Sequence, residues 1–324
     1  MDLSTPHISH AKVPAHKVLS ICWSVNIRNS GHQPASMWGR RLDLPSPACL
    51  LRKKSQFAKI SQRLFLIQTI SQVIPAMSQN TKKSDQAAHD VSAPADSKID
   101  HAASIRYWSS LPSTASNMLG MLGTYPWYTR IELQGSKNFL NKVRRLLPAL
   151  QSEGKFNLGV DCGAGVGRVT EGFLRHVCTV VDAVEPVQKF TQVLQEGQLK
   201  KDGVIGDIYT LGLEDWYPEK KYDLIWTQWC VGHLTDVQLV QYVSRCRNSL
   251  TENGIMVIKE NLSTHPGDQD MYDDEDSSVT RTDAKFKKIF DEAGMEVIKS
   301  EIQTGFPKQF KLLPVKSYAL RPKN

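Results

Sequence analysis

The 324-residue chain lacks any apolar run long enough to cross a membrane. Its longest such run, residues 64–74, is interrupted by Gln68, Thr69, Ser71 and Gln72, whereas a spanning helix needs about 20 apolar residues. The six cysteines include no C-x-x-C pair and no Cys/His spacing typical of a metal site, and they are too few for a disulfide framework. We therefore expect no transmembrane segment, no metal, and a reducing compartment, the cytoplasm or the nucleus.

Acidic residues are scarce at the N-terminus: residues 1–77 hold 10 Lys and Arg against 2 Asp and Glu, and residues 78–324 hold 30 against 31. The net charge of +7 thus belongs to this leader. The rest of the chain lacks the basic stripe with interleaved aromatics that binds nucleic acid, so no nucleic-acid partner is expected. The leader itself fits a disordered arm, an organellar transit peptide, which would make the protein organellar, or sequence upstream of a true start at Met77.

The composition of the sequence changes near residue 99. Residues 78–98 are small and polar, as in a linker, and dense apolar residues begin at Ile99. This predicts a leader and linker over 1–98 and one folded domain over 99–324. Short helices are expected between 102 and 150, the last over 135–150, with Pro126 interrupting them.

After Gly154, short apolar runs alternate with amphipathic stretches, which predicts an α/β fold with a doubly wound, mostly parallel sheet. Candidate strands cover residues 157–161, 179–184, 222–228, 254–259, 296–302 and 315–320, and candidate helices cover 168–176, 188–196, 236–249 and 284–293.

A glycine-rich turn connects the first predicted strand and helix. Gly163, Gly165 and Gly167 allow a tight turn and close approach of a ligand, and the helix begins at Arg168. The NAD fingerprint would need glycine at 168, and the Lys-Ser/Thr of a P-loop is missing. A ligand with a carboxylate for Arg168 and ribose hydroxyls for Glu185, after the next strand, fits better, which favours S-adenosylmethionine. The alternative is a plain strand-helix turn with a surface arginine.

The segment 226–236 reads Trp-x-Gln-Trp-x-x-Gly-His-Leu-Thr-Asp. Together with 161–168, 258–261 and 273–278, it resembles the protein N-terminal α-amine methyltransferase family, over about residues 107–321. Members of that family transfer methyl groups from S-adenosylmethionine to the exposed amine of proteins that begin Xaa-Pro-Lys/Arg once the initiator Met is removed. The resemblance implies a seven-stranded, Rossmann-like class I methyltransferase fold with N-terminal helical additions, S-adenosylmethionine as cofactor, and basic N-terminal peptides as partners.

The resemblance also implies roles for individual residues. Cofactor contacts are implied for Gly163, Gly165, Arg168, Glu185, Pro186, Val187, Leu213, Glu214 and Gln228; catalysis for Asp276, His233 and Asn261; and peptide binding for Tyr107, Trp108, Leu119, Trp229, Asp273 and Ser278. The chain departs from the family pattern at Leu313, where a tyrosine is common, and in the longer segment 118–131.

The implied roles make chemical sense. An α-amine has a pKa near 7.7–8.0, so a base must take its proton before the lone pair can attack a methyl group. His233 and Asp276 suit that task, and the amide of Asn261 can hold the substrate without changing charge.

Selectivity has a physical explanation as well. The acidic run 273–276 can pair with a Lys or Arg at the third substrate residue, and Trp108 and Trp229 offer flat walls for a proline ring. Three other functions stay open at this point: methylation of a small amine or another protein site, methylation of a nucleic acid, which the near-neutral domain and the acidic run oppose, and a non-catalytic adaptor that binds the cofactor.

Overall fold

The computed structural model describes residues 93–147 and 154–323. The predicted leader up to residue 92 lies outside the described residues, and the boundary at residue 98 stays a prediction. None of the described helices is both long and apolar enough to span a membrane.

A seven-stranded sheet forms the centre of the domain, with the strand order β3-β2-β1-β4-β5-β9-β8. The first five strands pair in parallel, and β9 runs antiparallel to both of its neighbours. The strands are β1 (Phe156–Cys162), β2 (Cys178–Val184), β3 (Ile205–Tyr209), β4 (Tyr222–Gln228), β5 (Leu250–Asn261), β8 (Met295–Ile302) and β9 (Val315–Pro322). The expected doubly wound, mostly parallel sheet is confirmed, and its strand order reverses between β1 and β4, where ligands bind in such sheets.

One strand of the sheet had no counterpart among the expected strands. β3 is only five residues long and contains Gly206 and Asp207, which weaken the strand pattern. Strand β5 is also longer than expected, because it begins at Leu250 rather than at residue 254. The other five strands lie within a few residues of their predicted positions.

Helices cover the sheet and its edge. They are η3 (Ala95–Lys98), α2 (His101–Ser110), η4 (Asn117–Thr124), α3 (Pro126–Leu146), the π-helical η6 (Thr170–Leu174), α4 (Arg175–Val177), α5 (Gln188–Glu196), α6 (Gln198–Lys201), η7 (Val231–His233), α7 (Asp236–Asn248), α8 (Asp283–Glu292) and η8 (Lys308–Phe310).

The start predicted for the helix over 135–150 is wrong. Helix α3 begins at Pro126, because the fixed φ of proline and its missing N–H suit the first helical turn. Gly135, the first residue of the predicted helix, lies inside α3, where an added Cβ would come 2.4 Å from the side chain of Gln303. The glycine therefore serves close packing against the segment after β8.

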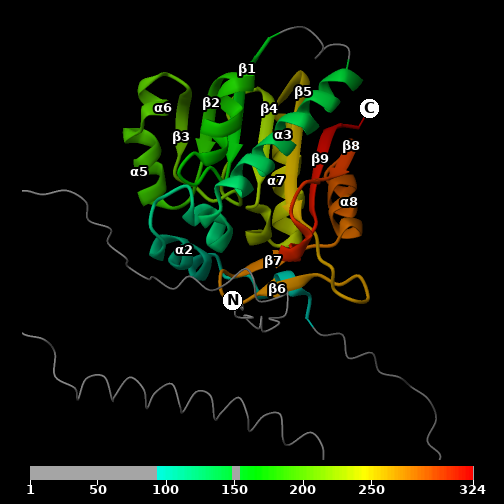
Figure 1. Cartoon of the computed structure of the whole chain (residues 1–324). Coiled ribbons are helices and arrows are strands. Elements are labelled where there is room, and N and C mark those ends of the chain that lie inside the picture. The colour runs from blue at the N-terminus through cyan, green and yellow to red at the C-terminus, as the bar shows by residue number, and fades with distance from the viewer. Residues whose placement is uncertain (1–92, 148–153, 324) are drawn as a thin grey trace, which may run out of the picture. The chain divides into compact units, whose positions relative to one another are not determined.

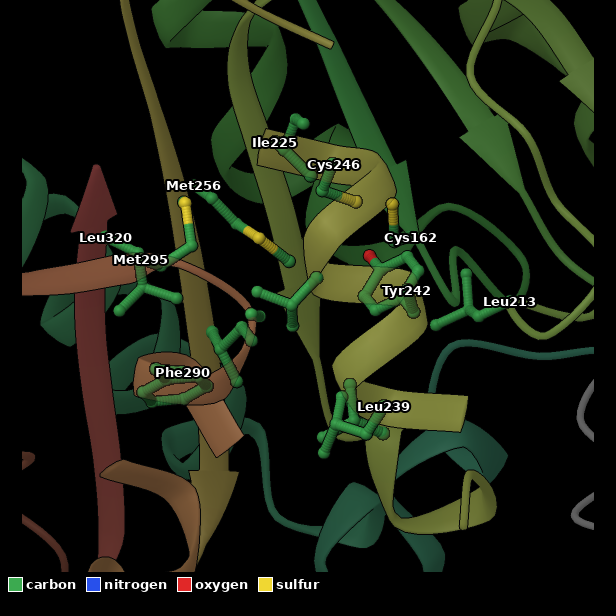
Figure 2. Packing of buried hydrophobic residues seen from close by; sticks show 14 of the residues in the cluster. Cys162, Leu213, Ile225, Leu239, Tyr242, Cys246, Met256, Phe290, Met295 and Leu320 are labelled. Atoms are coloured by element: carbon green, nitrogen blue, oxygen red, sulfur yellow. The ribbon is translucent and has the colours of Figure 1, made fainter. Parts of the chain in front are cut away.

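The core forms two apolar layers, one on each face of the sheet. Alternate strand residues point to opposite faces, so Ile225 and Met256 join the cluster beneath α7 and α8, whereas Trp226 and Val257 join the cluster beneath α3 and η6. Figure 2 shows the first layer, where the ring of Phe290 from α8 approaches the sheet. This three-layer arrangement fixes the ends of the parallel strands in space.

Helix α2 and a small antiparallel hairpin lie together at one edge of the sheet (Figure 1). The hairpin consists of β6 (Met271–Asp273) and β7 (Ser278–Thr280). Asp100 at the start of α2 donates its backbone N–H to Ser277 Oγ at 2.7 Å, which ties the helix to the hairpin turn. Both elements thus cover the carboxyl ends of the parallel strands.

Candidate active site

Two cavities meet at the carboxyl edge of the sheet. The first holds about 970 Å³ of empty space and the second about 1450 Å³, each partly open to solvent. Four side chains, those of Trp108, Met118, Trp229 and His233, line both cavities. Two molecules bound in the two cavities would therefore meet at these side chains.

The glycine turn forms the floor of the first cavity. Gly163, Gly165 and Gly167 all have positive φ values, of 74°, 55° and 85°. A Cβ on Gly163 would lie 2.5 Å from Cys230, and one on Gly165 would lie 2.8 Å from the sulfur of Met118. The turn therefore needs glycine both for its backbone conformation and for the space above it.

Glu185 projects a buried carboxylate into the same cavity. Its two oxygens accept hydrogen bonds from the backbone N–H groups of Gly165 and Val187, each at 2.9 Å. Burial raises the pKa of Glu185 to about 7, although these two hydrogen bonds oppose the shift. Each oxygen keeps a second lone pair, which suits a pair of ribose hydroxyls.

The structure brings together every residue predicted to contact the cofactor. The first cavity is lined by Gly163, Gly165, Arg168, Glu185, Pro186, Val187, Leu213, Glu214 and Gln228. The glycine turn leaves room for the cofactor, the buried carboxylate of Glu185 suits its ribose hydroxyls, and the cation Arg168 is predicted to face its carboxylate. The residues present therefore fit S-adenosylmethionine.

Arg168 has a protein partner that sequence reasoning missed. Its guanidinium donates to the carboxylate of Glu132 at 2.5 Å, and Glu132 also accepts from Lys259 at 2.7 Å and from Gln228 at 2.9 Å. Burial alone would raise the pKa of Glu132, but the two cations outweigh it and hold the pKa at about 2. The pairing of Arg168 with a ligand carboxylate stays a prediction.

No local sequence signal marks this buried network. Glu132 lies on α3 and Lys259 on β5, and both side chains are fully buried. Only the packing of α3 across the sheet brings them together, 127 residues apart in sequence.

The second cavity contains every residue predicted for catalysis and peptide binding. It is lined by Tyr107, Trp108, Leu119, Trp229, His233, Asn261, Asp273, Asp276 and Ser278. The four acidic residues 273–276 of the hairpin differ in their surroundings. Asp273 and Asp276 line the cavity, whereas Asp274 and Glu275 are exposed to solvent. The four acids thus form one pair directed at a ligand and one solvated pair.

Asp276 carries a buried oxygen that has no partner within the described residues. Oδ1 is inaccessible to solvent and accepts no hydrogen bond there, a state that costs about 1–3 kcal/mol for a neutral group and more for a charged one. Burial raises the pKa of Asp276, and nearby His233 opposes the rise. The carboxylate of Asp276 is therefore suited to take a proton from a ligand in the second cavity.

His233 lies beside Asp276 and is bound on both ring nitrogens. Nδ1 lies 2.8 Å from Ser104 Oγ, and Nε2 lies 3.2 Å from the indole nitrogen of Trp108. Burial lowers the pKa of His233, and the charge of Asp276 acts in the opposite direction. Ser104 and its contact were not expected from the sequence.

Trp229 is held in a strained conformation, with φ at 54° in a residue other than glycine. The carboxylate of Glu260 fixes the residues that follow, since its Oε1 accepts from the N–H groups of Cys230 at 2.8 Å and Val231 at 3.1 Å. Tyr128 stacks on the indole at a centroid distance of 6.3 Å. The indole is therefore presented to both cavities as a fixed wall.

The two departures from the family pattern both lie at the second cavity. Leu313 lines it, so an apolar side chain stands there. The segment 118–131 contains η4 with a kink at Gly120, followed by Tyr125 and Trp127, which pack on Phe310 outside the cavity lining. Of the three aromatic residues expected as an insertion in this segment, Tyr128 lines the second cavity, whereas Tyr125 and Trp127 do not.

Comparison with known proteins agrees with this geometry. The model of the AdoMet-dependent proline di-methyltransferase family matches residues 96–321. The chain belongs to this family. As a member of this family, it is a methyltransferase that uses S-adenosylmethionine.

Individual members of the family are similar along most of their length. The α N-terminal protein methyltransferase 1 of Schizosaccharomyces pombe is 39% identical over 67% of this chain and 94% of its own. The N-terminal Xaa-Pro-Lys N-methyltransferase 1-A of Xenopus laevis is 36% identical over 66% and 92%. The structure of a methyltransferase from Leishmania major is 32% identical, with a TM-score of 0.60 over 68% of this chain and 82% of that one.

Proposed function

We propose that the protein transfers methyl groups from S-adenosylmethionine to the free α-amine of proteins that begin Xaa-Pro-Lys or Xaa-Pro-Arg after removal of the initiator Met. The names of its relatives support the class of substrate. The observation that carries the proposal is the half-buried carboxylate of Asp276, a residue that lines the second cavity beside His233, which lines both cavities.

The reaction begins with loss of a proton. An α-ammonium group has no lone pair, so one N–H bond must break before the nitrogen can attack. The carboxylate of Asp276, which lines the second cavity, accepts this proton, and its raised pKa brings it closer to the ordinary pKa of the amine, which favours the transfer. When bound, S-adenosylmethionine supplies an electrophilic methyl group on its sulfonium.

The other residues of the second cavity hold the peptide in line. Asn261, at the end of β5, can donate and accept a hydrogen bond with its amide, and Trp108 and Trp229 offer apolar faces for a proline ring. Asp273 meets the basic third residue of the substrate. Since the sulfonium is an activated donor, positioning and deprotonation account for most of the catalysis.

The decisive experiment is mass spectrometry of a Ser-Pro-Lys peptide incubated with the full chain and S-adenosylmethionine. We expect the mass to rise by whole methyl groups, and no rise when the N-terminus is acetylated or when proline is replaced by alanine. Cofactor binding without peptide methylation would refute the proposal and favour a small amine, another protein site or an adaptor.

A pair of variants tests the role of Asp276. Asp276→Asn keeps the size of the side chain and removes the base, so turnover should fall by about 10²–10⁴-fold while cofactor binding persists. Asp274→Asn removes a charge two residues away on the exposed side of the same turn and should leave turnover unchanged. Equal activity of the two variants would contradict the assignment of the base.

We infer the cytoplasm or the nucleus as the compartment. The four described cysteines are all free thiols, which is consistent with reducing conditions. Imaging of the tagged full chain against a version starting at residue 78 tests this inference, and import of the full chain alone into an organelle would contradict it.

A further inference from the structure

The turn that carries His233 lies between strand β4 and helix α7. It contains η7 and then Leu234 and Thr235, which lead into α7. Two long backbone bonds close it, from the N–H of His233 to Cys230 at 3.3 Å and from the N–H of Leu234 to Val231 at 3.2 Å. Because a single 3₁₀ turn has poor hydrogen-bond geometry, its position depends on partners from other segments.

Arg281, the residue after β7, is such a partner. Its guanidinium donates to the carbonyl oxygens of Val231 at 3.0 Å and Leu234 at 2.5 Å, and to the carboxylate of Asp236 at 2.8 Å. These three acceptors lie on both sides of His233 in the chain. The planar guanidinium presents its N–H donors in a rigid fork, so the three bonds hold the turn as one unit.

The side chain of Arg281 is fully buried and lines neither cavity. It therefore contacts neither ligand directly. Its backbone is fixed as well, since its carbonyl accepts from the N–H of Ser263 at 2.9 Å. In proteins, an apolar pair of similar volume is often as stable as a buried ion pair. Stability alone thus does not account for a buried arginine here, whereas a fixed position of the turn does.

Arg281 also joins the two segments that carry the candidate catalytic groups. Asp276 lies in the hairpin turn between β6 and β7, and His233 lies on η7. The hairpin and η7 are in close contact, because a Cβ on Gly232 would come 3.2 Å from the carbonyl oxygen of Val279. The bonds from Arg281 to η7 therefore set where His233 lies relative to Asp276.

The contacts of the His233 ring depend on this position. Its two nitrogens lie 2.8 Å from Ser104 Oγ and 3.2 Å from the indole nitrogen of Trp108, and the backbone of Ser277 is a further hydrogen-bond partner. The first two partners belong to α2 and the third to the hairpin. A shift of η7 would therefore change the contacts of the ring with both segments.

We propose that Arg281 is a positioning residue that holds the turn 231–236 against the hairpin and thereby fixes His233 beside Asp276 where the two cavities meet. The inference rests on the proposed function, because these two groups act together only if a peptide amine arrives beside them. Arg281 takes no part in the methyl transfer itself. Its removal lets the turn shift, and displacement of a catalytic group by about 1 Å can lower the rate about 100-fold.

The test compares the full chain with Arg281→Met and Arg281→Lys. Methionine fills part of the space and removes all three bonds. Lysine keeps the charge but lacks the planar fork, so it forms fewer of these bonds and serves where Arg281→Met does not fold. Lys285→Met is the matched control, since the ammonium of Lys285 also binds the carboxylate of Asp236, at 2.7 Å, from the surface side of the ion pair.

We expect kcat with the Ser-Pro-Lys peptide to fall about 10–100-fold in Arg281→Met, by a smaller factor in Arg281→Lys, and to stay near the wild-type value in Lys285→Met. The Kd for S-adenosylmethionine, measured by calorimetry, should change little, because the glycine turn and Glu185 bind each other rather than Arg281.

Hydrogen exchange followed by mass spectrometry separates positioning from general stability. Exchange should become faster in residues 230–236 of the Arg281 variants, while strand β1 stays as protected as in the wild type. A residue that only stabilised the fold would raise exchange in the sheet as well.

Both effects are required. If the wild type methylates the peptide, an unchanged kcat, an unchanged turn, or faster exchange throughout the sheet in the Arg281 variants overturns the inference, and so does failure of both variants to fold. If the turn alone loosens as expected but the wild type does not methylate the peptide, the hold of Arg281 on the turn is supported and the proposed peptide substrate is refuted.

Discussion

Removal of the Glu132 carboxylate charge tests how much the buried ion pairs of Glu132 contribute to the stability of the fold around the two cavities. Glu132 is fully buried and receives hydrogen bonds from Arg168, Lys259 and Gln228. Glu132→Gln keeps the shape of the side chain but leaves the equally buried ammonium of Lys259 without a counter-charge. Breaking a buried ion pair in this way costs about 3–5 kcal/mol of unfolding free energy.

The expected loss of unfolding free energy corresponds to a lower melting temperature. In a domain of this size, 1 kcal/mol corresponds to about 2–4 °C, so Glu132→Gln should lower the Tm by about 6–20 °C. Denaturant titration of purified protein measures the free energy, and thermal unfolding followed by circular dichroism measures the Tm.

The matched control is a surface ion pair of similar length. Glu301 pairs with Lys142 at 2.6 Å, but the two side chains are 36% and 46% exposed. Glu301→Gln should therefore cost at most about 1 kcal/mol. If Glu132→Gln lowers the free energy of unfolding no more than Glu301→Gln does, the reasoning about the buried network is refuted.

A double variant separates charge from packing. Glu132→Leu with Lys259→Met removes both ends of the pair and leaves Arg168, whose side chain is 7% exposed, without its partner. Because one buried cation rather than two is then left without a counter-charge, this variant should be more stable than Glu132→Gln. Additive losses in the double variant would contradict the coupling between the two residues.

The remaining predictions concern the two ligands. Asp273→Lys should raise the KM for peptides with a basic third residue more than it lowers kcat, and steady-state kinetics with unchanged selectivity would contradict the charge pairing. Glu185, with its pKa raised to about 7 by burial, accepts both ribose hydroxyls only when ionised, so the Kd for S-adenosylmethionine should rise as pH falls below about 7. Calorimetry should show weaker, pH-independent binding in Glu185→Gln, and an equal slope in both proteins would exclude Glu185 as the titrating group. Leu313→Tyr adds a hydroxyl to the wall of the second cavity and should lower the KM for the peptide without changing cofactor affinity, whereas an unchanged KM would mean that this wall does not contact the substrate.

Local patterns in the sequence predicted many of the strands and helices correctly. The glycine turn, the apolar runs of β1 and β4 and the amphipathic α5 can each be recognised from a few neighbouring residues, since periodicity and turn chemistry act over that range. Strand β3 was missed because its local strand preference is weak, and the start of α3 was missed because Pro126 was interpreted as an interruption rather than as a first helical residue.

For the candidate site, too, some residues could be named from the sequence and others only from the structure. Glu185 could be named from its place after a strand, because the carboxyl ends of parallel strands converge, whereas His233 was named from the resemblance to the family. Their hydrogen-bond partners could not be named. Glu132 reaches Lys259 across 127 residues, and Ser104 reaches His233 across 129.

The sequence by itself determined the fold class and the glycine cradle, because these depend on residue type and local spacing, and its resemblance to the family named most of the groups that face the two cavities. Only the tertiary structure decided which groups are charged, paired or free. Burial and long-range contacts assign Arg168 to Glu132, separate Asp276 from its exposed neighbours in the acidic run, and bring Ser104 and Trp108 to the two ring nitrogens of His233. Protonation and pairing depend on distance and on exclusion of water, and both arise only when distant segments pack together.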